Sequence, residues 1–329
     1  MLASWVFLRK TLCGIIVAVI FIERHNSLQK KIAFEVESDL IKLNDRLKLI
    51  LNLNENELTN NLEKYLLSSS KKLRPILIFL LVKALGKNVL DSHIKIASSV
   101  ELIHNATLIH DDIIDGSALR RGNKSLNYEF DNKLAVVAGD YLLALALDEL
   151  LNVGSIDVLK LFTSSLSHVC EGEINQYFQK GKVVDIESYI DRSKQKTAIL
   201  FQVALESIIL LSCELDHLNA VRTFAINFGI AFQIKDDLTN VLHTDLSKPA
   251  FNDYLSGTYT APIIFLAQFN ENYASIEPNK LLQTLKTSGA IEQTKILINK
   301  HINLAIDSLS FLDDNCSKRS IIEICRSLG

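Results

Sequence analysis

The stretch that decides the fold runs from Ile94 to Asp115 and reads IKIASSVELIHNATLIHDDIID. Up to His110 it is apolar on most of the circumference that a helix would have, which is typical of a helix buried in a helical core. Its end carries three carboxylates, Asp111, Asp112 and Asp115. Because residues four apart share one face of a helix, Asp111 and Asp115 should project together, with Asp112 beside them. The sequence therefore predicts a central helix with an acidic cluster at its end.

Clustered carboxylates of this kind are costly unless a hard cation lies among them. Mg²⁺ fits, because it binds carboxylate oxygens and leaves coordination positions open for phosphate oxygens. The spacing recurs in Asp236-Asp237-Leu238-Thr239-Asn240 after the apolar run Phe224–Ile234, with Asn240 in place of a third carboxylate. Two such helices packed side by side would hold Mg²⁺ ions around one diphosphate at the mouth of an apolar pocket. The alternative for either cluster is a solvated acidic helix end.

The rest of the chain also has helical spacing. No stretch alternates with period two for long enough to make a convincing strand. With four prolines, twelve glycines and no linker-like run in 329 residues, we expect one helical domain over residues 26–329. An amphipathic helix should begin near Ser27, and Pro75 suits the first turn of a buried helix that reaches Leu85. The later helices expected are Leu134–Leu151, Ile156–Tyr177, Ile186–Leu211, Leu215–Leu242, Thr260–Phe269, Pro278–Ser288 and Ile291–Leu312.

Charge, cysteines and the N-terminus narrow the class of protein. A net charge of −3 gives no basic footprint for nucleic acid, which we exclude as a partner. The five cysteines are scattered without a Cys-x-x-Cys pair and indicate a reducing compartment. In residues 1–25, Arg9 and Lys10 precede the apolar run Leu12–Ile22, which is shorter than the roughly 20 residues of a membrane span. We expect a hydrophobic targeting or anchor segment that could associate with a membrane; the alternative is an extension irrelevant to the fold.

Cations gather in the turns near the acidic clusters. Arg offers a planar fork and Lys a point charge to phosphate oxygens. Any one of them alone would be an ordinary solvated side chain, but together with the acidic clusters they indicate a diphosphate. The set is Lys71, Lys72, Arg74, Arg120, Arg121, Lys196 and Lys248.

Eight blocks, in order along the chain, resemble those of the trans-isoprenyl diphosphate synthases, from about residue 30 to the C-terminus. They are Ser69-Ser70-Lys71-Lys72-Leu73-Arg74-Pro75, Glu101–Asp115, Arg120-Arg121-Gly122, Ala138-Gly139-Asp140-Tyr141, Gly172–Gln176, Lys196-Thr197-Ala198, Phe232–Asp237, and Lys248-Pro249-Ala250 running into Asp253. The resemblance implies an all-α, single-domain bundle around a deep central cavity. It also implies a homodimer, with a heterodimer as the alternative.

The resemblance also assigns roles to residues. It places Mg²⁺ on Asp111, Asp115 and Asp236, and it makes Asp111, Asp112, Asp115, Lys196, Asp236 and Asp237 catalytic. Isopentenyl diphosphate would be bound by Lys71, Arg74, His104 and Arg121. The allylic diphosphate and its metals would be held by Asp111, Asp115, Arg120, Lys196, Thr197 and Gln233, assisted by Lys248. The chemistry agrees, since Mg²⁺ and cations stabilise a departing diphosphate and the isopentenyl double bond attacks the allylic carbocation.

Small residues one turn before Asp111 bear on product length. In this family bulky aromatics there end the pocket early, whereas Ala106 and Thr107 are small, so the tunnel should run deeper, past Leu102 and Ile103. We therefore expect a medium- or long-chain all-trans product for a quinone side chain. A plastid is the favoured location, with cytoplasm and mitochondrion as alternatives.

Three departures from the family pattern keep other functions open. Ser69-Ser70 replaces a usual glycine pair, Lys235 stands where an apolar residue is usual and could compete with Mg²⁺ for carboxylates, and Asn240 replaces an aspartate. A catalytically weak or regulatory subunit of a heteromeric synthase is therefore the main alternative. A class I terpene cyclase would not need the second-substrate cations, and a His-Asp metal phosphohydrolase would rest on His110-Asp111 alone. A pure binding protein would leave the acidic clusters unexplained.

Overall fold

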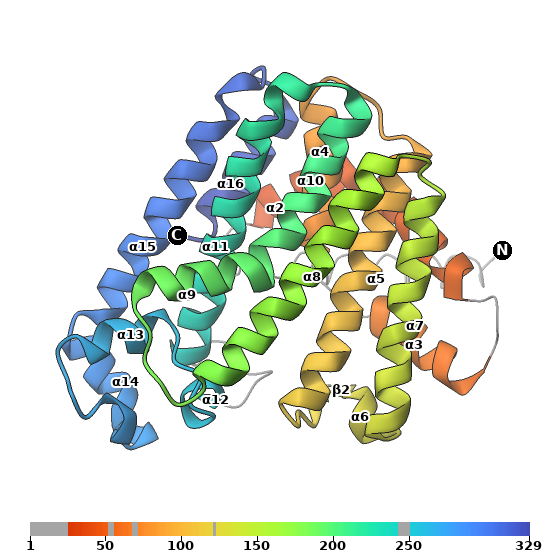
Figure 1. Cartoon of the computed structure of the whole chain (residues 1–329). Helices are drawn as coiled ribbons and strands as arrows, with labels where there is room; N and C mark the ends of the chain where they lie inside the picture. Colours follow the sequence, from red (N-terminus) through yellow and green to blue (C-terminus); the bar gives the residue numbers. More distant parts are fainter. Residues whose placement is uncertain (1–25, 52–55, 68–71, 121–122, 243–250) are drawn as a thin grey trace. The chain divides into compact units, whose positions relative to one another are not determined.

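The computed structural model describes residues 26–51, 56–67, 72–120, 123–242 and 251–329 (Figure 1). Most of these residues are helical, which confirms the predicted all-α fold. They cluster into two compact units: the described parts of Met1–Leu159 with Asp314–Ile321 (the first unit), and of Lys160–Asp313 with Ile322–Gly329 (the second unit). The predicted N-terminal segment, residues 1–25, lies outside the described residues, and the boundary drawn there stays a prediction.

The elements follow one another closely along the chain. In the first unit they are α2 (Asn26–Leu51), α3 (Glu57–Leu67), α4 (Leu73–Ala84), α5 (Asp91–Ile114), β1 (Leu119–Arg120), β2 (Asn123–Lys124), α6 (Leu126–Glu129) and α7 (Asn132–Leu151). Helix α8 (Ile156–Gln179) runs from the first unit into the second. In the second unit they are α9 (Ile186–Ser193), the π-helix η1 (Lys194–Ala198), α10 (Ile199–Ser212), η2 (Leu215–His217), α11 (Leu218–Leu242), α12 (Asn252–Leu255), α13 (Ala261–Ala267), η3 (Tyr273–Ser275), α14 (Pro278–Thr287), α15 (Ala290–Asp307) and η4 (Ser308–Phe311). The last helix, α16 (Cys316–Arg326), is divided between the units.

Helix α5 forms the centre of the first unit, as its sequence predicts, and packs against α2, α4 and α7. Helix α4 is buried throughout Ile76–Val82, so it has no face for solvent. Helix α2 is amphipathic, because Val36, Leu43 and Leu47 are fully buried while Phe34 is 81% exposed. These faces surround the helix that carries the first acidic cluster.

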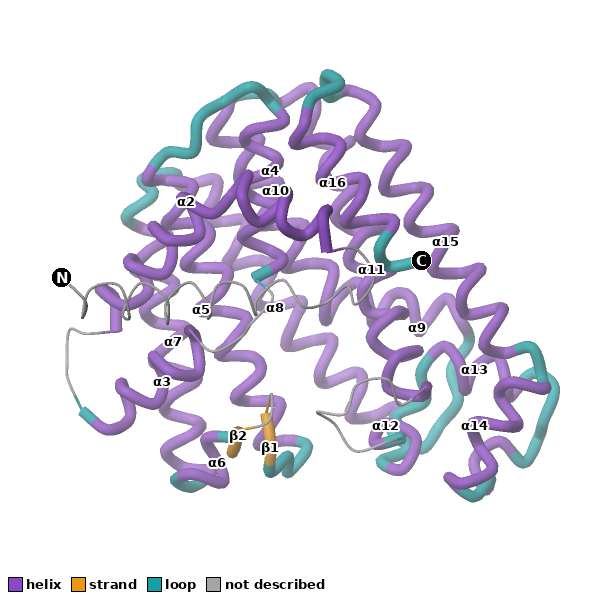
Figure 2. The backbone as a smooth tube through the Cα atoms, turned by 180° about the vertical axis from the view of Figure 1, so that it is seen from behind, coloured by secondary structure: helices purple, strands orange, loops and turns teal. Residues whose placement is uncertain are grey.

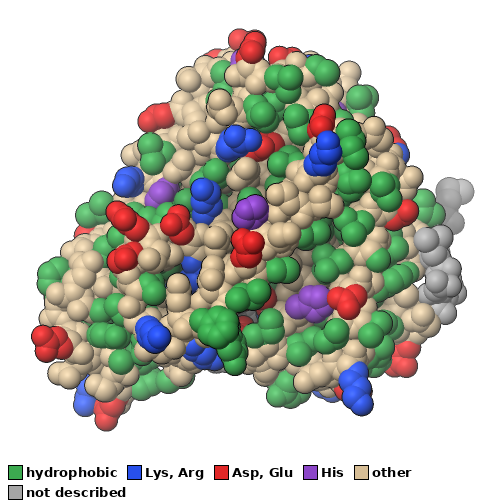
Figure 3. All heavy atoms as spheres, viewed as in Figure 1, with side chains coloured by type: hydrophobic (Ala, Val, Ile, Leu, Met, Phe, Trp, Pro, Cys, Tyr) green, Lys and Arg blue, Asp and Glu red, His purple; other side chains and the backbone are tan. Residues whose placement is uncertain are grey.

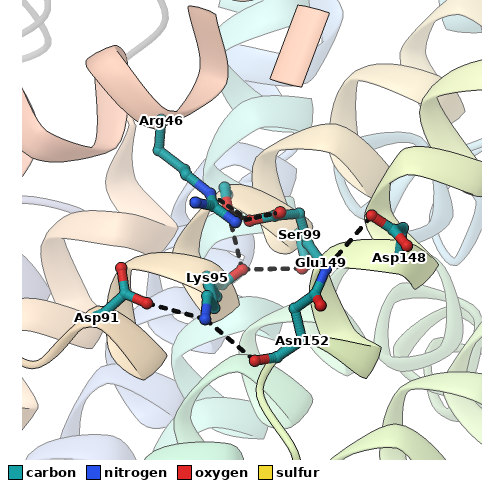
Figure 4. A network of polar contacts seen from close by, with 8 residues as sticks. Arg46, Asp91, Lys95, Ser99, Asp148, Glu149 and Asn152 are labelled. Carbon is teal, nitrogen blue, oxygen red and sulfur yellow. Dashed lines mark hydrogen bonds and ion pairs between the residues drawn. The ribbon is translucent and has the colours of Figure 1, made fainter. Parts of the chain in front are cut away.

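A buried carboxylate fastens three helices of the first unit together (Figure 4). Glu149 of α7 is only 3% exposed and accepts two hydrogen bonds from Arg46 of α2, at 2.8 and 2.7 Å. The hydroxyl of Ser98 on α5 donates to the same carboxylate at 3.1 Å. Nearby, Lys95 of α5 pairs with Asp91 at 2.8 Å. Because a buried charge is tolerated only when it is paired and hydrogen-bonded, this network fixes how α2 and α7 pack on α5.

Helix α11 forms the centre of the second unit and packs against α10, η1, α13 and α15. Its buried side includes Phe224 and Phe228, whose rings stack with centroids 5.8 Å apart. Phe201 of α10 meets Phe228 edge-on at 5.2 Å. The apolar run before the second acidic cluster is thus a core helix, as predicted.

Two local features differ from the sequence predictions. The segment predicted as one helix, Ile186–Leu211, is interrupted by η1, a π-helical turn at Lys194–Ala198. π-turns inside helices are often found at functional sites. Among the described residues, β1 and β2 form one short antiparallel pair after α5 (Figure 2). The sequence analysis did not predict this pair, because it found no long alternation of polar and apolar residues. Helix α16 was also not predicted.

The surface mixes charged and apolar side chains. Figure 3 shows acidic and basic side chains, some of them side by side, intermixed with apolar residues on one face. On α8, Ile174, Tyr177 and Phe178 are 55%, 71% and 73% exposed. Among the described residues, one helical stretch, Ile186–Ser212, is long and apolar enough to span a bilayer, but 61% of its apolar window is buried. A core helix of a soluble protein meets the same criterion, so this is weak evidence for a membrane span.

Candidate active site

The first acidic cluster lies in the last turn of α5. Asp111 is half-buried and Asp115, the C-cap residue, is exposed. The backbone N–H of Asp115 donates to the carbonyl of Asp111 at 2.9 Å, so one helical turn joins the two. The last turn contains no basic residue. Because the C-terminal end of a helix carries a partial negative charge, carboxylates there need a cation from elsewhere.

Asp112 has a different environment from its two neighbours. It is 1% exposed and accepts hydrogen bonds from Arg120 of β1, with Nε at 3.0 Å from Oδ1 and 3.1 Å from Oδ2. Tyr65 of α3 lies 3.4 Å from the same carboxylate. Burial alone would lower the pKa of Arg120, but the bonds to Asp112 raise it. Because Asp112 is buried and forms an ion pair with Arg120, the more exposed Asp111 and Asp115 are the candidate metal ligands of this cluster.

The predicted cations of the first unit are only partly described. Arg74 lies in the first turn of α4 and is 8% exposed, and Lys72 just before it donates to Asn44 of α2. His104 is half-buried, seven residues before Asp111 and on the same face of α5. The predicted site residues Lys71, Arg121 and Lys248, together with Ser69 and Ser70, lie outside the described residues.

His110 faces α7 and not the carboxylates of α5. Its Nε2 lies 3.4 Å from the carbonyl oxygen of Val136 and 3.6 Å from the carboxylate of Asp140. The ring fits there because Gly139 has no side chain, since a Cβ would come within 2.2 Å of Nε2. This placement gives no support to a metal site built on the His110-Asp111 pair.

The second acidic cluster shows the same division between an open and a buried aspartate. On α11, Asp236 is half-buried, whereas Asp237 is 5% exposed. Asp237 accepts hydrogen bonds from Tyr189 at 2.5 Å and from Gln233 at 2.7 Å. Burial and the nearby charge of Asp253 raise the pKa of Asp237 to about 7, although the bond from Tyr189 opposes the shift. Asp236 is therefore the candidate metal ligand of this cluster.

The π-turn η1 brings Lys196 and Thr197 to α8 and α11. Lys196 forms an ion pair with Glu173 of α8, with Nζ and Oε1 2.5 Å apart. Thr197 donates to Oε1 of Gln233 at 2.5 Å. Two glycines permit these approaches: a Cβ on Gly172 would lie 3.1 Å from Gln195, and one on Gly229 would lie 2.5 Å from the Cα of Ala198. The structure thus joins three predicted residues, Thr197, Gln233 and Asp237, in one hydrogen-bonded group.

Two unusual residues of the second cluster, Lys235 and Asn240, have charged neighbours that the sequence did not indicate. The amide of Asn240 donates to the carboxylate of Asp253 on α12 at 3.1 Å. A carboxylate at position 240 would instead repel Asp253. Burial, followed by the charge of Lys295 on α15, lowers the pKa of Lys235. The charge that perturbs Lys235 therefore comes from α15, and the expected competition with Mg²⁺ stays a prediction.

Three further side chains contact the predicted residues, and sequence reasoning missed their part in the site. They are Tyr65, Glu173 and Tyr189. Glu173 stands within one of the eight blocks, so its acidic side chain gave a weak signal. Tyr65 and Tyr189 lie on other helices, far in sequence from the aspartates they contact, and no spacing rule could have found them.

The oxygen donors fit the expected Mg²⁺. In the part of the chain that is described, no group of three or more His, Cys, Asp or Glu side chains is arranged to hold a metal ion. Each cluster instead offers one or two carboxylates that are at least partly exposed, namely Asp111 with Asp115 in the first cluster and Asp236 in the second. Mg²⁺ is commonly bound by one or two carboxylates, with substrate phosphates and water completing its octahedron.

An all-helical fold with such carboxylates and neighbouring cations defines a class of diphosphate-handling enzymes, and comparison with known proteins identifies the family. The family model described as "Polyprenyl synthetase" matches residues 55–298. A prenyl transferase of Cyanidium caldarium is 34% identical over 308 residues, covering 89% of this chain and 95% of the relative. The chloroplastic solanesyl diphosphate synthase 2 of Arabidopsis thaliana is 30% identical over 317 residues, covering 91% of this chain and 75% of the relative.

A solved structure agrees with these relatives. The polyprenyl synthase of Caulobacter crescentus, in complex with calcium and isoprenyl diphosphate, superposes with a TM-score of 0.83 at 25% identity, covering 91% of this chain and 96% of that one. The chain therefore belongs to the polyprenyl synthetase family, and it is a trans-prenyltransferase. The resemblance found in the eight sequence blocks is confirmed.

Proposed function

We propose that this enzyme condenses isopentenyl diphosphate with an allylic diphosphate and makes a medium- or long-chain all-trans polyprenyl diphosphate. The observation that carries the proposal is a difference in burial between the first and second aspartates of each acidic cluster. In each one, the second aspartate, Asp112 or Asp237, is buried and hydrogen-bonded. The first, Asp111 or Asp236, is more open. Such a pattern holds the helix end in place and presents a partly exposed carboxylate to a metal–diphosphate.

Two sets of residues bind the two diphosphate substrates in this proposal. Bound Mg²⁺, held by Asp111, Asp115 and Asp236, would neutralise charge on the allylic diphosphate. Arg120, Lys196, Thr197, Gln233 and Lys248 orient that diphosphate, and Lys71, Arg74, His104 and Arg121 hold isopentenyl diphosphate. As the allylic C–O bond breaks, the cations stabilise the charge on the leaving group. The isopentenyl double bond then attacks the carbocation and one proton is lost, with no covalent enzyme intermediate.

Chain length is proposed from the interior of α5. Ala106 and Leu102 are fully buried and Ile103 is 1% exposed, so this face borders packed interior and not solvent. A small residue at 106 leaves room for a growing chain beyond the diphosphate. The solanesyl relative supports a long product, for which a quinone side chain is the expected use, and its chloroplast location supports a plastid.

A homodimer is the proposed assembly. Exposed apolar side chains support it: Val136 and Val137 on α7 are 43% and 58% exposed, and Tyr177 and Phe178 on α8 are more so. Exposed apolar groups of this kind mark contact surfaces between proteins. Light scattering of the purified chain measures the assembly, and a monomer that is fully active would refute the proposal.

Incorporation of labelled isopentenyl diphosphate with Mg²⁺ and an allylic primer tests the activity. The wild-type chain should give products longer than ~20 carbons, since a small residue at position 106 would not stop the growing chain as an aromatic one would. Asp111→Ala should abolish incorporation and Asp236→Ala should reduce it, whereas the exposed Asp313→Ala is the matched control and should leave it unchanged. Ala106→Phe should shorten the product, and an unchanged length would refute the tunnel.

The same assay decides between the enzyme and its alternatives. If no primer supports incorporation, the chain is a catalytically weak or regulatory subunit. A cyclic hydrocarbon released from the allylic diphosphate alone would indicate a terpene cyclase instead.

A further inference from the structure

Tyr189 begins a chain of hydrogen bonds that ends at Thr197. It lies on α9 and is 1% exposed, and its hydroxyl donates to Oδ2 of Asp237 at 2.5 Å. The other oxygen of Asp237, Oδ1, accepts from Nε2 of Gln233 at 2.7 Å. Oε1 of Gln233 then accepts from the hydroxyl of Thr197 at 2.5 Å. Three bonds thus connect α9, α11 and η1.

The chemistry of the four groups gives this chain a direction. The hydroxyl of Tyr189 and the amide nitrogen of Gln233 both donate to Asp237, which accepts one bond on each oxygen. The amide oxygen of Gln233 must then face Thr197, and the assignment of its oxygen and nitrogen follows from the network. Thr197 has a single hydroxyl proton and gives it to Gln233. The oxygen lone pairs of Thr197 can then accept a hydrogen bond from another group.

The phenol ring is itself held firmly. The guanidinium of Arg192 lies over the ring, 5.6 Å from its centroid, and donates to the carbonyl of Tyr259 at 3.0 Å. Burial raises the pKa of Tyr189 well above its usual value, so the hydroxyl keeps the proton that it donates. A buried hydroxyl without a partner would be costly, and phenylalanine would fill the same space. The hydroxyl is therefore explained by its bond to Asp237.

We infer that Tyr189 is a positioning residue, which acts through Asp237 and Gln233 to fix the direction in which the Thr197 hydroxyl points during prenyl transfer. The inference rests on the proposed function, because Thr197 and Gln233 are expected to contact the allylic diphosphate. Tyr189 is not among the residues expected to make this contact. Its effect passes along the hydrogen bonds and does not depend on the charge of the metal site.

Tyr189→Phe removes the first bond of the chain and little volume. Loss of one hydrogen bond in a network predicts about a tenfold fall in kcat, with the KM for isopentenyl diphosphate unchanged. Tyr128→Phe is the matched control, since Tyr128 is 57% exposed on α6 and should behave as wild type. Equal kcat values for Tyr189→Phe and wild type would overturn the inference.

A double-mutant cycle separates positioning from general support of the fold. If the chain leads to Thr197, Tyr189→Phe should cost about tenfold in the wild type and almost nothing in Thr197→Val, where the end of the chain is already missing. Equal losses in both backgrounds would show a merely structural role and refute the inference.

An exchange of groups tests the direction itself and does not require Tyr189→Phe to fold. Asp237→Asn places an amide nitrogen opposite Gln233, which turns the Gln233 amide and leaves Thr197 to donate elsewhere, so kcat should fall. Adding Gln233→Glu restores a carboxylate acceptor for Thr197, and at least tenfold of the lost kcat should return. No recovery would overturn the inference.

Wild-type activity is measured beside every variant. An inactive wild type would reject the proposed function, whereas an active wild type with unaffected variants would reject only the role of Tyr189.

Discussion

Gly229 allows α11 and η1 to approach closely, and Gly229→Ala tests whether that contact positions the site. A Cβ at position 229 would lie 2.5 Å from the Cα of Ala198 and 2.6 Å from its Cβ. Ordinary contact begins at 3.4 Å, so the two segments must separate by about 1 Å. Gln233 lies one turn further along α11, and Thr197 directly precedes Ala198. The bond of 2.5 Å between Thr197 and Gln233 would therefore lengthen beyond hydrogen-bonding distance.

The magnitude follows from two opposing effects. In an unhindered helix, replacing glycine by alanine stabilises by about 1 kcal/mol. Overlap in a packed interior costs about 1–3 kcal/mol, and here the obstacle is backbone that cannot rotate away. Because the obstacle is rigid backbone, we expect a net loss near the upper limit of this difference, about 2 kcal/mol in the free energy of unfolding. A misplacement of this size can reduce kcat by about a hundredfold.

Urea unfolding and the incorporation assay measure the two effects. Gly172→Ala is the comparison variant, because its Cβ would lie 3.1 Å from the side chain of Gln195 and so needs a smaller shift. Adding Ala198→Gly to Gly229→Ala removes only the contact between Cβ atoms and should not restore stability. A Gly229→Ala enzyme as stable and active as wild type would refute the reasoning about close approach.

Two further predictions concern stability alone. Burial lowers the pKa of His301 from its usual 6.5 to about 4, so the folded state favours the neutral ring, and the stability present above pH 6.5 is lost as pH falls toward 4. Urea unfolding should show wild type losing about 3 kcal/mol more than His301→Gln between pH 7 and pH 4, and parallel pH profiles would contradict this. Arg46→Met leaves buried Glu149 without its ion pair and should cost about 3 kcal/mol in the same assay. Arg319→Met is the control, since both it and its partner Asp314 are exposed, and its cost should stay under about 1 kcal/mol; equal costs would be inconsistent with a buried pair.

Much of the fold could be predicted from periodicity. The stripe predicted along α2 is buried, and Pro75 lies in the first turn of α4. Periodicity could not reveal the π-turn η1 at Lys194–Ala198, because the helical spacing of apolar residues continues before and after it. The wider turn changes the backbone hydrogen bonding and not the composition. The β1–β2 pair was missed because two-residue strands have no alternation to detect.

The candidate site divides in the same way. Local spacing placed Asp111 with Asp115 and identified two acidic clusters, because i and i+4 neighbours depend on the helix alone. It could not predict that Asp112 pairs with Arg120, or that Asp237 accepts from Tyr189, since these contacts join different elements. Nor could it predict that Asn240 supports Asp253.

The sequence by itself determined the helices, their buried faces and the type of chemistry, because hydrophobic spacing and residue type act over one or two turns. Tertiary structure decided which aspartate in each cluster stays partly exposed and which is buried. The physical reason is that burial and hydrogen-bond direction arise only when helices distant in sequence meet. Tyr189 shows this most directly: it is one tyrosine among eight in the sequence, and its contact with Asp237 alone distinguishes it.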